Sequence, residues 1–288
     1  MRCTVLFLLS AAGLLADDII AYDLSGYYHQ FGTADLTTGV VSPTGALEQL
    51  ETGLGVYNGS LYTASASDLY NVNTSTGSLT APIDPFGVHM LDLGSTLSGL
   101  YGVGYGTGDG SSMSDLGLYS INASTGLTTL VGLTRLSYTA GEYVSLSTNS
   151  STLYYGDANE LYTIATTTGL AVAVGSFGGS GSYQMEAMTM INGVLYGADA
   201  NSKAIDTINI GTGLATLGPT SAVLYGLAPK PLPTTPEPGS WRLLAVGIAG
   251  LMVAKRMRAD QTRRYFLRTS TSTPPTTVRP GIGTPKIS

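Results

Sequence analysis

Short alternations of apolar and polar residues recur along the chain, and each one ends in Thr-Gly. Alternation with a period of two indicates a strand, and glycine supplies the positive φ that closes a turn. An Asn or Asp four residues before the glycine can cap that turn through its side chain. Each stretch therefore predicts a hairpin, with turn glycines at Gly39, Gly77, Gly126, Gly169 and Gly213. The five stretches align without gaps and are FGTADLTTG from Phe31, LYNVNTSTG from Leu69, LYSINASTG from Leu118, LYTIATTTG from Leu161 and IDTINIGTG from Ile205.

A further predicted strand with a Leu-Tyr pair precedes four of the hairpins. The four copies are SLYTAS at Ser60, GLYGVG at Gly99, TLYYGD at Thr152 and VLYGAD at Val194. A fifth copy, VLYGLA at Val223, has no hairpin after it, and the hairpin at Phe31 has no clear copy before it. A leftover strand at the end and a missing one at the start predict a closed ring, in which the last strand completes the first blade.

The turn glycines lie 38, 49, 43 and 44 residues apart. A period near 40 to 50 with three or four strands a unit predicts an all-β fold, a β-propeller of about five blades. A β-helix usually repeats at a shorter period, and a two-sheet sandwich leaves five similar hairpins unexplained. The repeats resemble the degenerate propeller repeats of exported bacterial proteins.

Composition supports many short strands and argues against one class of partner. Only 11% of residues are charged and 38 are glycine, and 18 tyrosines against five phenylalanines suit half-buried strand surfaces. Residues 17–229 hold 17 acidic and two basic residues, whereas residues 230–288 hold ten basic and two acidic ones. The acidic body excludes a nucleic-acid partner, which needs a basic face.

The N-terminus predicts an export signal. Arg2 is a short basic region, Cys3–Leu15 is an apolar helix, and Ala16 is a small residue at a cleavage site. Cleavage after Gly13 is the alternative, and a buried first helix or strand is the competing interpretation. Cys3 is the one cysteine and precedes the apolar run, so it does not fit a lipoprotein cysteine, which would follow that run.

The C-terminal region predicts a single membrane helix. Leu243–Ala254 has 12 uncharged residues, about 18 Å of helix, which is too short for a bilayer core of about 30 Å. Adding residues 239–242 and 255–257 gives about 28 Å, with Arg242 and Lys255 extending outward. The basic cluster that follows is predicted to remain in the cytoplasm.

The segment resembles the PEP-CTERM sorting segment of exported bacterial proteins. The resemblance rests on Pro236, Glu237, Pro238 and Gly239, then an apolar helix, then Lys255, Arg256 and Arg258. It implies recognition by a membrane enzyme of the exosortase type, and release of the mature protein to the cell surface or exopolysaccharide matrix. The same segment ends some ice-binding proteins. The alternative is an ordinary single-pass anchor, because 30 residues follow the basic cluster here and the family usually stops sooner.

The sequence thus predicts an exported protein that the C-terminal helix anchors in a membrane. It also predicts five regions. They are a signal peptide (1–16), a propeller-like repeat domain (17–229), a Pro-rich linker with the PEP motif (230–238), a membrane sorting helix with its basic cluster (239–258) and a disordered tail (259–288).

Catalytic, metal and cofactor motifs are scarce. His29 and His89 are the two histidines, and neither HExxH, CxxC nor GxSxG is present. The Gly-rich stretch Gly102–Ser112 has no phosphate-loop register and predicts a long flexible loop. Six carboxylates near strand ends could hold calcium, but turn capping is the favoured interpretation. These are Asp109, Asp115, Asp157, Glu160, Asp199 and Asp206.

The sequence therefore predicts no catalytic residue, no metal site and no cofactor. The leading hypothesis is a non-enzymatic protein of the cell envelope that presents a propeller to a polysaccharide or a surface protein. A glycan hydrolase or lyase with two carboxylates at the ring centre is the alternative. Ice binding through Thr-rich stretches ranks lower, because the threonines fall in turns.

Overall fold

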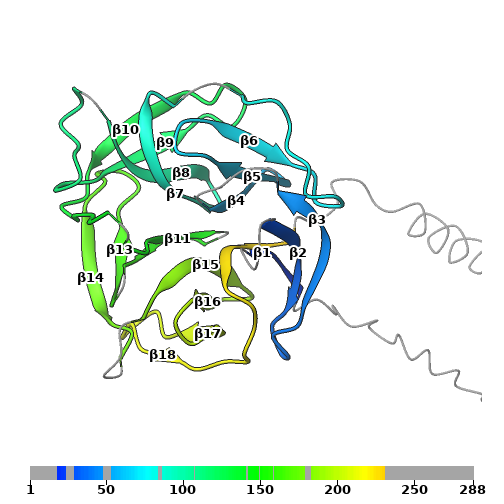
Figure 1. Cartoon of the computed structure of the whole chain (residues 1–288). Coiled ribbons are helices and arrows are strands. Elements are labelled where there is room, and N and C mark those ends of the chain that lie inside the picture. The colour runs from blue at the N-terminus through cyan, green and yellow to red at the C-terminus, as the bar shows by residue number, and fades with distance from the viewer. Residues whose placement is uncertain are drawn as a thin grey trace, which may run out of the picture. The chain divides into compact units, whose positions relative to one another are not determined.

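Five antiparallel groups of three or four strands surround a common centre in a computed structural model of the chain (Figure 1). The fourth and fifth groups also pair in parallel, Ser147 with Met188 and Thr148 with Thr189, so these two groups form one eight-stranded sheet. The sheets belong to one compact unit, Met1–Leu232, and the second unit, Pro233–Ser288, lies outside the described residues. The structure describes residues 18–23, 29–47, 53–83, 86–106, 108–140, 142–148, 150–157, 159–178 and 183–230. The described part is all-β and propeller-like, as predicted.

Each group is a blade whose first strand lies nearest the centre. Blade 1 is β19 (Leu224–Pro229), β1 (Asp18–Asp23), β2 (His29–Asp35) and β3 (Val41–Leu47). Blade 2 is β4 (Leu54–Tyr57), β5 (Ser60–Ala64) and β6 (Leu69–Val72). Blade 3 is β7 (Val88–Thr96), β8 (Gly99–Gly106), β9 (Gly117–Ile121) and β10 (Thr128–Leu133). Blade 4 is β11 (Ser145–Thr148), β12 (Leu153–Gly156), β13 (Glu160–Ile164) and β14 (Ala171–Ser176). Blade 5 is β15 (Met185–Ile191), β16 (Val194–Asp199), β17 (Ala204–Ile208) and β18 (Ala215–Thr216).

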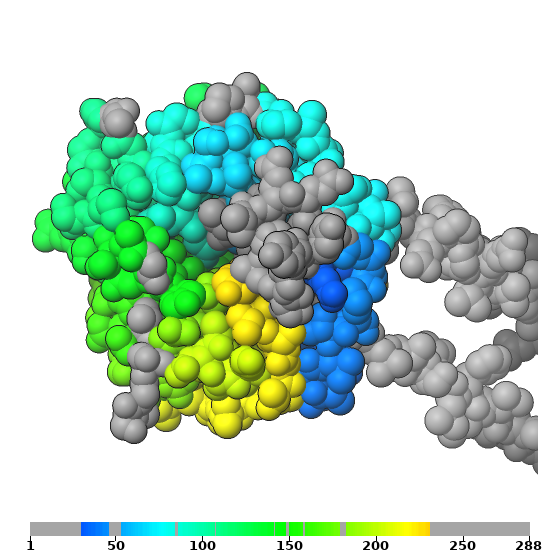
Figure 2. Space-filling view, in the orientation of Figure 1, coloured from blue at the N-terminus to red at the C-terminus, as the bar shows by residue number. Residues whose placement is uncertain are grey.

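The ring closes through the two ends of the described chain. β19 pairs antiparallel with β1, from Ile19 opposite Pro229 to Asp23 opposite Leu224. Figure 2 shows the yellow C-terminal end of the described chain beside the blue residues that follow β1 in the chain. The predicted closure is present, and the last strand completes the first blade as expected. The Leu-Tyr copy in β19 is a first strand, whereas the other four copies are second strands, and β1 is the second strand of blade 1. β1 was missed because DIIAYD has no Leu-Tyr pair.

The Leu-Tyr pairs explain why the chain has so many tyrosines. Successive residues of a strand point to opposite faces, so one side chain meets the preceding blade and the other meets the next blade. Leu61 packs in the cluster between blades 1 and 2, and Tyr62 packs in the cluster between blades 2 and 3. Leu195 and Tyr196 repeat this division in blade 5. Five hydrophobic clusters result, one between each pair of neighbouring blades.

The Thr-Gly turns follow the third strand of each blade and share one backbone geometry. In four blades the turn leads to a fourth strand, and in blade 2 it leads to a single bridge between Val72 and Leu79. In each turn the glycine N–H donates to the carbonyl four residues earlier, as from Gly39 to Asp35 at 2.8 Å. The five turn glycines have φ between 70° and 78°, where any side chain is strained. Asn or Asp caps four turns, as in Asn122, whose Oδ1 accepts from the Ser124 N–H at 3.0 Å. Ala165 takes this position in blade 4 and offers no cap.

Several turn glycines also touch the preceding blade. A Cβ on Gly169 of blade 4 would lie 2.4 Å from the carbonyl oxygen of Gly132 in blade 3. Gly213 of blade 5 meets Gly175 of blade 4 in the same way, at 2.2 Å. Because backbone meets backbone there, the repeated glycine is required by blade packing as well as by the turn.

Antiparallel blades give the ring two different faces. The turn face carries the turns between first and second strands and the Thr-Gly turns that follow the third strands. The loop face carries the loops between second and third strands and the connections from one blade to the next. β19 runs toward the turn face and β1 runs away from it, so the chain enters and leaves the ring on the turn face.

The predicted signal peptide, linker, sorting motif, membrane helix and tail lie outside the described residues. Among the residues that are described, no helix is long and apolar enough to cross a membrane.

Replacing Gly169 by alanine should destabilise the protein more than replacing Gly193. Both have positive φ, but a Cβ on Gly193 meets nothing within 4 Å. Gly193→Ala should therefore cost about 1–2 kcal/mol of strain, and Gly169→Ala about 2–5 kcal/mol because overpacking adds to it. Urea unfolding of both variants measures the difference. Equal losses would show that the turn glycine does not hold the blades together.

Candidate functional site

The carboxylates predicted at strand ends lie mainly in loops of the loop face and act on the backbone. Asp157 Oδ1 accepts from the N–H groups of Asn159 and Glu160, both at 2.8 Å. Asp199 accepts from the N–H of Gln184, at 2.9 Å, and Asp115 from that of Arg135, also at 2.9 Å. The remaining three are engaged as well, through Ser111 and Tyr119 (Asp109), Tyr162 (Glu160) and Gly218 (Asp206). Loop capping, the favoured interpretation, explains Asp157, Asp199 and Asp115. Glu160 instead accepts from the hydroxyl of Tyr162 in its own strand, and Asp206 lies within β17 with its Oδ2 buried and without a hydrogen-bond partner.

The Gly-rich stretch differs from its prediction. Gly102–Gly106 belongs to β8 and is not a loop. The following segment is held by a small polar network, in which the Tyr119 hydroxyl donates to Asp109 at 2.5 Å and the Ser111 N–H donates to the same carboxylate at 2.9 Å. The loop prediction failed for Gly102–Gly106 because Leu100, Tyr101 and Val103 supply enough strand-forming side chains between the glycines, whereas residues 108–112 lie between β8 and β9 as predicted.

Asp92, on the first strand of blade 3, links three blades. Its side chain is 2% exposed, Oδ1 accepts from the Leu93 N–H at 2.8 Å, and Oδ2 accepts from the Leu146 N–H in blade 4. A Cβ on Gly53, next to blade 2, would lie 1.7 Å from Oδ1, so only glycine fits there. Burial raises the pKa of Asp92 well above its usual value, and repulsion from Glu186 adds to the effect.

Glu186, on the first strand of blade 5, is the second carboxyl group near the ring centre. Its Oε1 is buried and accepts no hydrogen bond. Burial raises the pKa of Glu186 to about 8, so the group keeps its proton at neutral pH. A neutral carboxyl group can donate a proton. However, both oxygens of Asp92 are occupied by backbone N–H groups, so the pair lacks a free base to match that donor.

The other candidates for chemistry are brought into no common site. His89 is exposed and stacks on Tyr105 with ring centroids 4.9 Å apart, and the side chain of His29 lies outside the described part. Across the described ranges, no group of three or more His, Cys, Asp or Glu residues could hold a metal ion.

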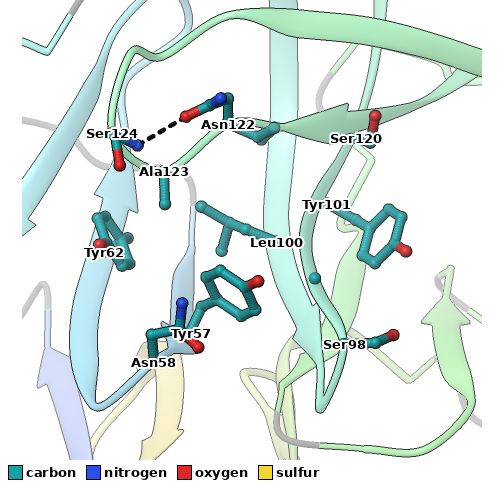
Figure 3. A pocket seen from close by; sticks show the side chains of 12 residues that line it. Tyr57, Asn58, Tyr62, Ser98, Leu100, Tyr101, Ser120, Asn122, Ala123 and Ser124 are labelled. Carbon is teal, nitrogen blue, oxygen red and sulfur yellow. Dashed lines mark hydrogen bonds between the residues drawn. The ribbon is translucent and has the colours of Figure 1, made fainter.

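A groove of about 580 Å³ opens on the turn face between blades 2 and 3 (Figure 3). Its aromatic walls come from Tyr57 at the end of β4 and Tyr62 in β5, whereas the ring of Tyr101 in β8 packs between blades 3 and 4, on the other side of that strand. Two turns border the groove: Asn58 and Gly59 join β4 to β5, and Leu97 and Ser98 join β7 to β8. The remaining side chains are uncharged. They are polar at Asn58, Ser98, Ser120, Asn122 and Ser124 and apolar at Leu100, Ile121 and Ala123.

This lining combines flat aromatic surfaces with neutral hydrogen-bonding groups. Tyrosine presents an apolar ring and a polar tip, and hydroxyl and amide groups both donate and accept hydrogen bonds. No lining residue carries a charge, so a charged ligand would lose water without gaining an ion pair. The groove therefore suits a neutral, hydroxyl-rich ligand.

The sequence analysis missed the groove, Asp92 and Glu186. Tyr57 lies on a short first strand, LGVY, which matches no repeat. The Asn58-Gly59 pair is a signal that could have found the β4–β5 hairpin, because this dipeptide is typical of two-residue turns. Asp92 and Glu186 lie within apolar runs whose first-strand role becomes visible only when the ring is assembled.

Comparison with known proteins reveals only distant likenesses. No family model matches the sequence. No curated protein sequence matches it either. The structure is similar to a chain of the nidogen/laminin complex, with a TM-score of 0.46 and 12% identity over 73% of this chain and 84% of that one. It is also similar to regucalcin, a calcium-binding protein from Agrobacterium tumefaciens, with a TM-score of 0.39 and 19% identity over 61% and 62% of the two chains. A glutaminyl cyclase from Myxococcus xanthus gives a TM-score of 0.39 and 17% identity over 62% and 69%. These matches concern the propeller-like fold alone.

Replacing Glu186 by glutamine should change how stability depends on pH. The folded state keeps the proton to about pH 8, whereas the unfolded chain loses it near 4.5, so unfolding releases a proton between these values. The native protein should therefore lose stability as pH rises from about 4.5 to 8, by about 2 kcal/mol or more. Glu186→Gln should be about as stable as the native protein at pH 4.5 and more stable at pH 9.

Urea unfolding at pH 4.5, 7 and 9 measures this effect. Glu142→Gln is the control, since Glu142 is exposed and glutamine keeps an acceptor for the Thr139 N–H. A variant that tracks the native protein at all three pH values would contradict the assignment.

Proposed function

We propose that the chain is an exported binding protein without enzymatic activity, and that its groove between blades 2 and 3 holds a neutral glycan. The observation that carries the proposal is the lining of that groove, in which two tyrosines, Tyr57 and Tyr62, stand among uncharged hydroxyl and amide groups. Sugars present both an apolar ring face and many hydroxyl groups. A tyrosine ring complements the first and the Asn and Ser side chains complement the second.

Export and anchoring rest on the sequence at the two ends. The apolar stretch after Arg2 supports secretion, and the segment from Pro236 to Arg258 supports retention in a membrane with recognition by an exosortase-like enzyme. Release to the cell surface or exopolysaccharide matrix would follow from that recognition. A glycan ligand accords with such a location.

The central carboxyl groups favour glycan binding over glycan cleavage by a hydrolase or a lyase. Glycan hydrolysis uses two carboxyl groups that can both reach the substrate. Asp92 is 2% exposed and its oxygens are engaged by Leu93 and Leu146, which gives it a structural role. Ice binding is less suitable, because the Thr-rich turns belong to five different blades and do not form one row.

Replacing Tyr57 by alanine should weaken binding of a neutral oligosaccharide about three- to tenfold, since it removes one stacking surface. The measurement is calorimetric titration of the full chain with glucose and mannose oligosaccharides, and with uronic-acid oligosaccharides for comparison. Tyr105→Ala is the matched control, because Tyr105 is a half-exposed tyrosine that stacks on His89 outside the groove. Equal losses in both variants, or tighter binding of the acidic oligosaccharides, would contradict the proposal.

A further inference from the structure

Exposed aliphatic side chains are concentrated on the turn face. Ten large hydrophobic side chains are exposed among the described residues. Met113 lies on the loop face, and Val172 and Leu217 lie in or beside outer strands. The other seven lie in or beside turns of the turn face and are Val40, Leu97, Leu127, Leu170, Val194, Ile210 and Leu214.

Four of these residues occupy one position of the repeat, directly after the turn glycine. They are exposed by 59% at Val40, 67% at Leu127, 40% at Leu170 and 52% at Leu214. Blade 2 has Ser78 there, so the turn itself accepts a polar residue. Folding therefore does not require an aliphatic side chain at this position, and its repetition around the ring calls for another reason.

Charged side chains, unlike the exposed aliphatic ones, are concentrated on the loop face. Among the side chains that the structure describes, the turn face has Asp35, whose carboxylate caps its own turn through Thr37 and Thr38, and Lys230. The backbone of β1 also begins on this face with Asp18, opposite Asp35. The loop face carries most of the other charged side chains that the structure describes, which are Asp68, Asp109, Asp115, Arg135, Glu142, Asp157, Glu160, Asp199 and Lys203. A surface with aliphatic side chains and few charges can approach a lipid bilayer while stripping water from few ions.

The chain leaves the ring toward the predicted membrane segment from the turn face. β19 ends at Pro229 on this face, and eight residues, 231–238, separate Lys230 from Gly239 at the start of the predicted membrane segment. A fully extended chain covers at most about 3.6 Å a residue, so this linker spans no more than about 30 Å. Because the tether is short, the turn face, from which it leaves, is the face favoured to meet the membrane.

We infer that the turn face rests on the lipid bilayer, with its ring of aliphatic side chains in the headgroup region and the acidic loop face turned away. The inference rests on the membrane anchor of the proposed function. Tyr57 of the groove opens on the same face, and tyrosine favours the membrane interface. The glycan that the groove takes is then one at the membrane surface. Lipid suits the aliphatic ring better than a protein partner, because residues in separate blades, spaced by Thr, Ser and Asn, do not form one contiguous apolar core.

The test measures which face of the full chain meets lipid. With Cys3 replaced by serine, single cysteines are introduced as Leu127→Cys or Leu214→Cys on the turn face and Met113→Cys on the loop face. Each carries an environment-sensitive dye, and each protein is reconstituted into phosphatidylcholine vesicles with and without lipids that bear a shallow quencher. We expect the dyes at 127 and 214 to lose most of their fluorescence and the dye at 113 to keep it.

A second variant tests the aliphatic ring itself. This variant carries serine, the residue that blade 2 already has, after the turn glycine of every other blade, so the fold should be retained. The four substitutions are Val40→Ser, Leu127→Ser, Leu170→Ser and Leu214→Ser. A dye at Leu97→Cys should be quenched in the parent and lose that quenching in this variant. Circular dichroism checks that this variant is folded. If it is not, the four substitutions are tested one at a time.

Three outcomes would overturn the inference. They are equal quenching on both faces, no association of the chain with vesicles, and protection of the turn-face dyes by dimerisation in the absence of lipid. The vesicles contain no glycan, so a failure here is independent of a failure of glycan binding in the calorimetric titration. Conversely, quenching on the turn face would stand even if no oligosaccharide bound the groove.

Discussion

The two ends of the described chain meet in blade 1, where β19 lies between the ring centre and β1. Without that pairing, blade 1 would lack its first strand and β1 would present an unpaired edge. The clusters on both sides of blade 1 would also lose Leu224 and Ala228. The same pairing places the entry and exit of the chain on one face, which is why the composition of that face bears on a membrane.

Blade packing explains the repeat more fully than turn formation does. Leu-Tyr pairs divide their side chains between two neighbouring blades, and Thr-Gly turns bring backbone against backbone at Gly132 and Gly169. A ring of blades therefore constrains the same few positions in every unit, while the residue after the turn glycine is left free by packing. Its aliphatic character in four blades therefore reflects a property of the surface and not a requirement of packing.

Much of this arrangement could be predicted from the sequence, because the second and third strands carry their signal locally. Alternation, a Leu-Tyr pair and a Thr-Gly turn identify them in most blades. First strands are different. LGVY and SLST are short and match no repeat, and they become strands because they line the ring centre beside their neighbours. β1 has no Leu-Tyr pair, so the ring could be anticipated while its second strand in blade 1 was missed. The candidate site was harder to predict, since the groove unites turns from blades 2 and 3 that are 40 residues apart, Asn58 and Ser98 among them.

Hydrogen exchange of backbone amides in the full chain tests the closure of the ring most directly. If β19 and β1 hold the ring together, their amides should exchange as slowly as those of β8 and β16, because they open only when the whole ring unfolds. Amides of β19 that exchange at the rate of an unstructured chain, while blades 2 to 5 remain protected, would contradict the account.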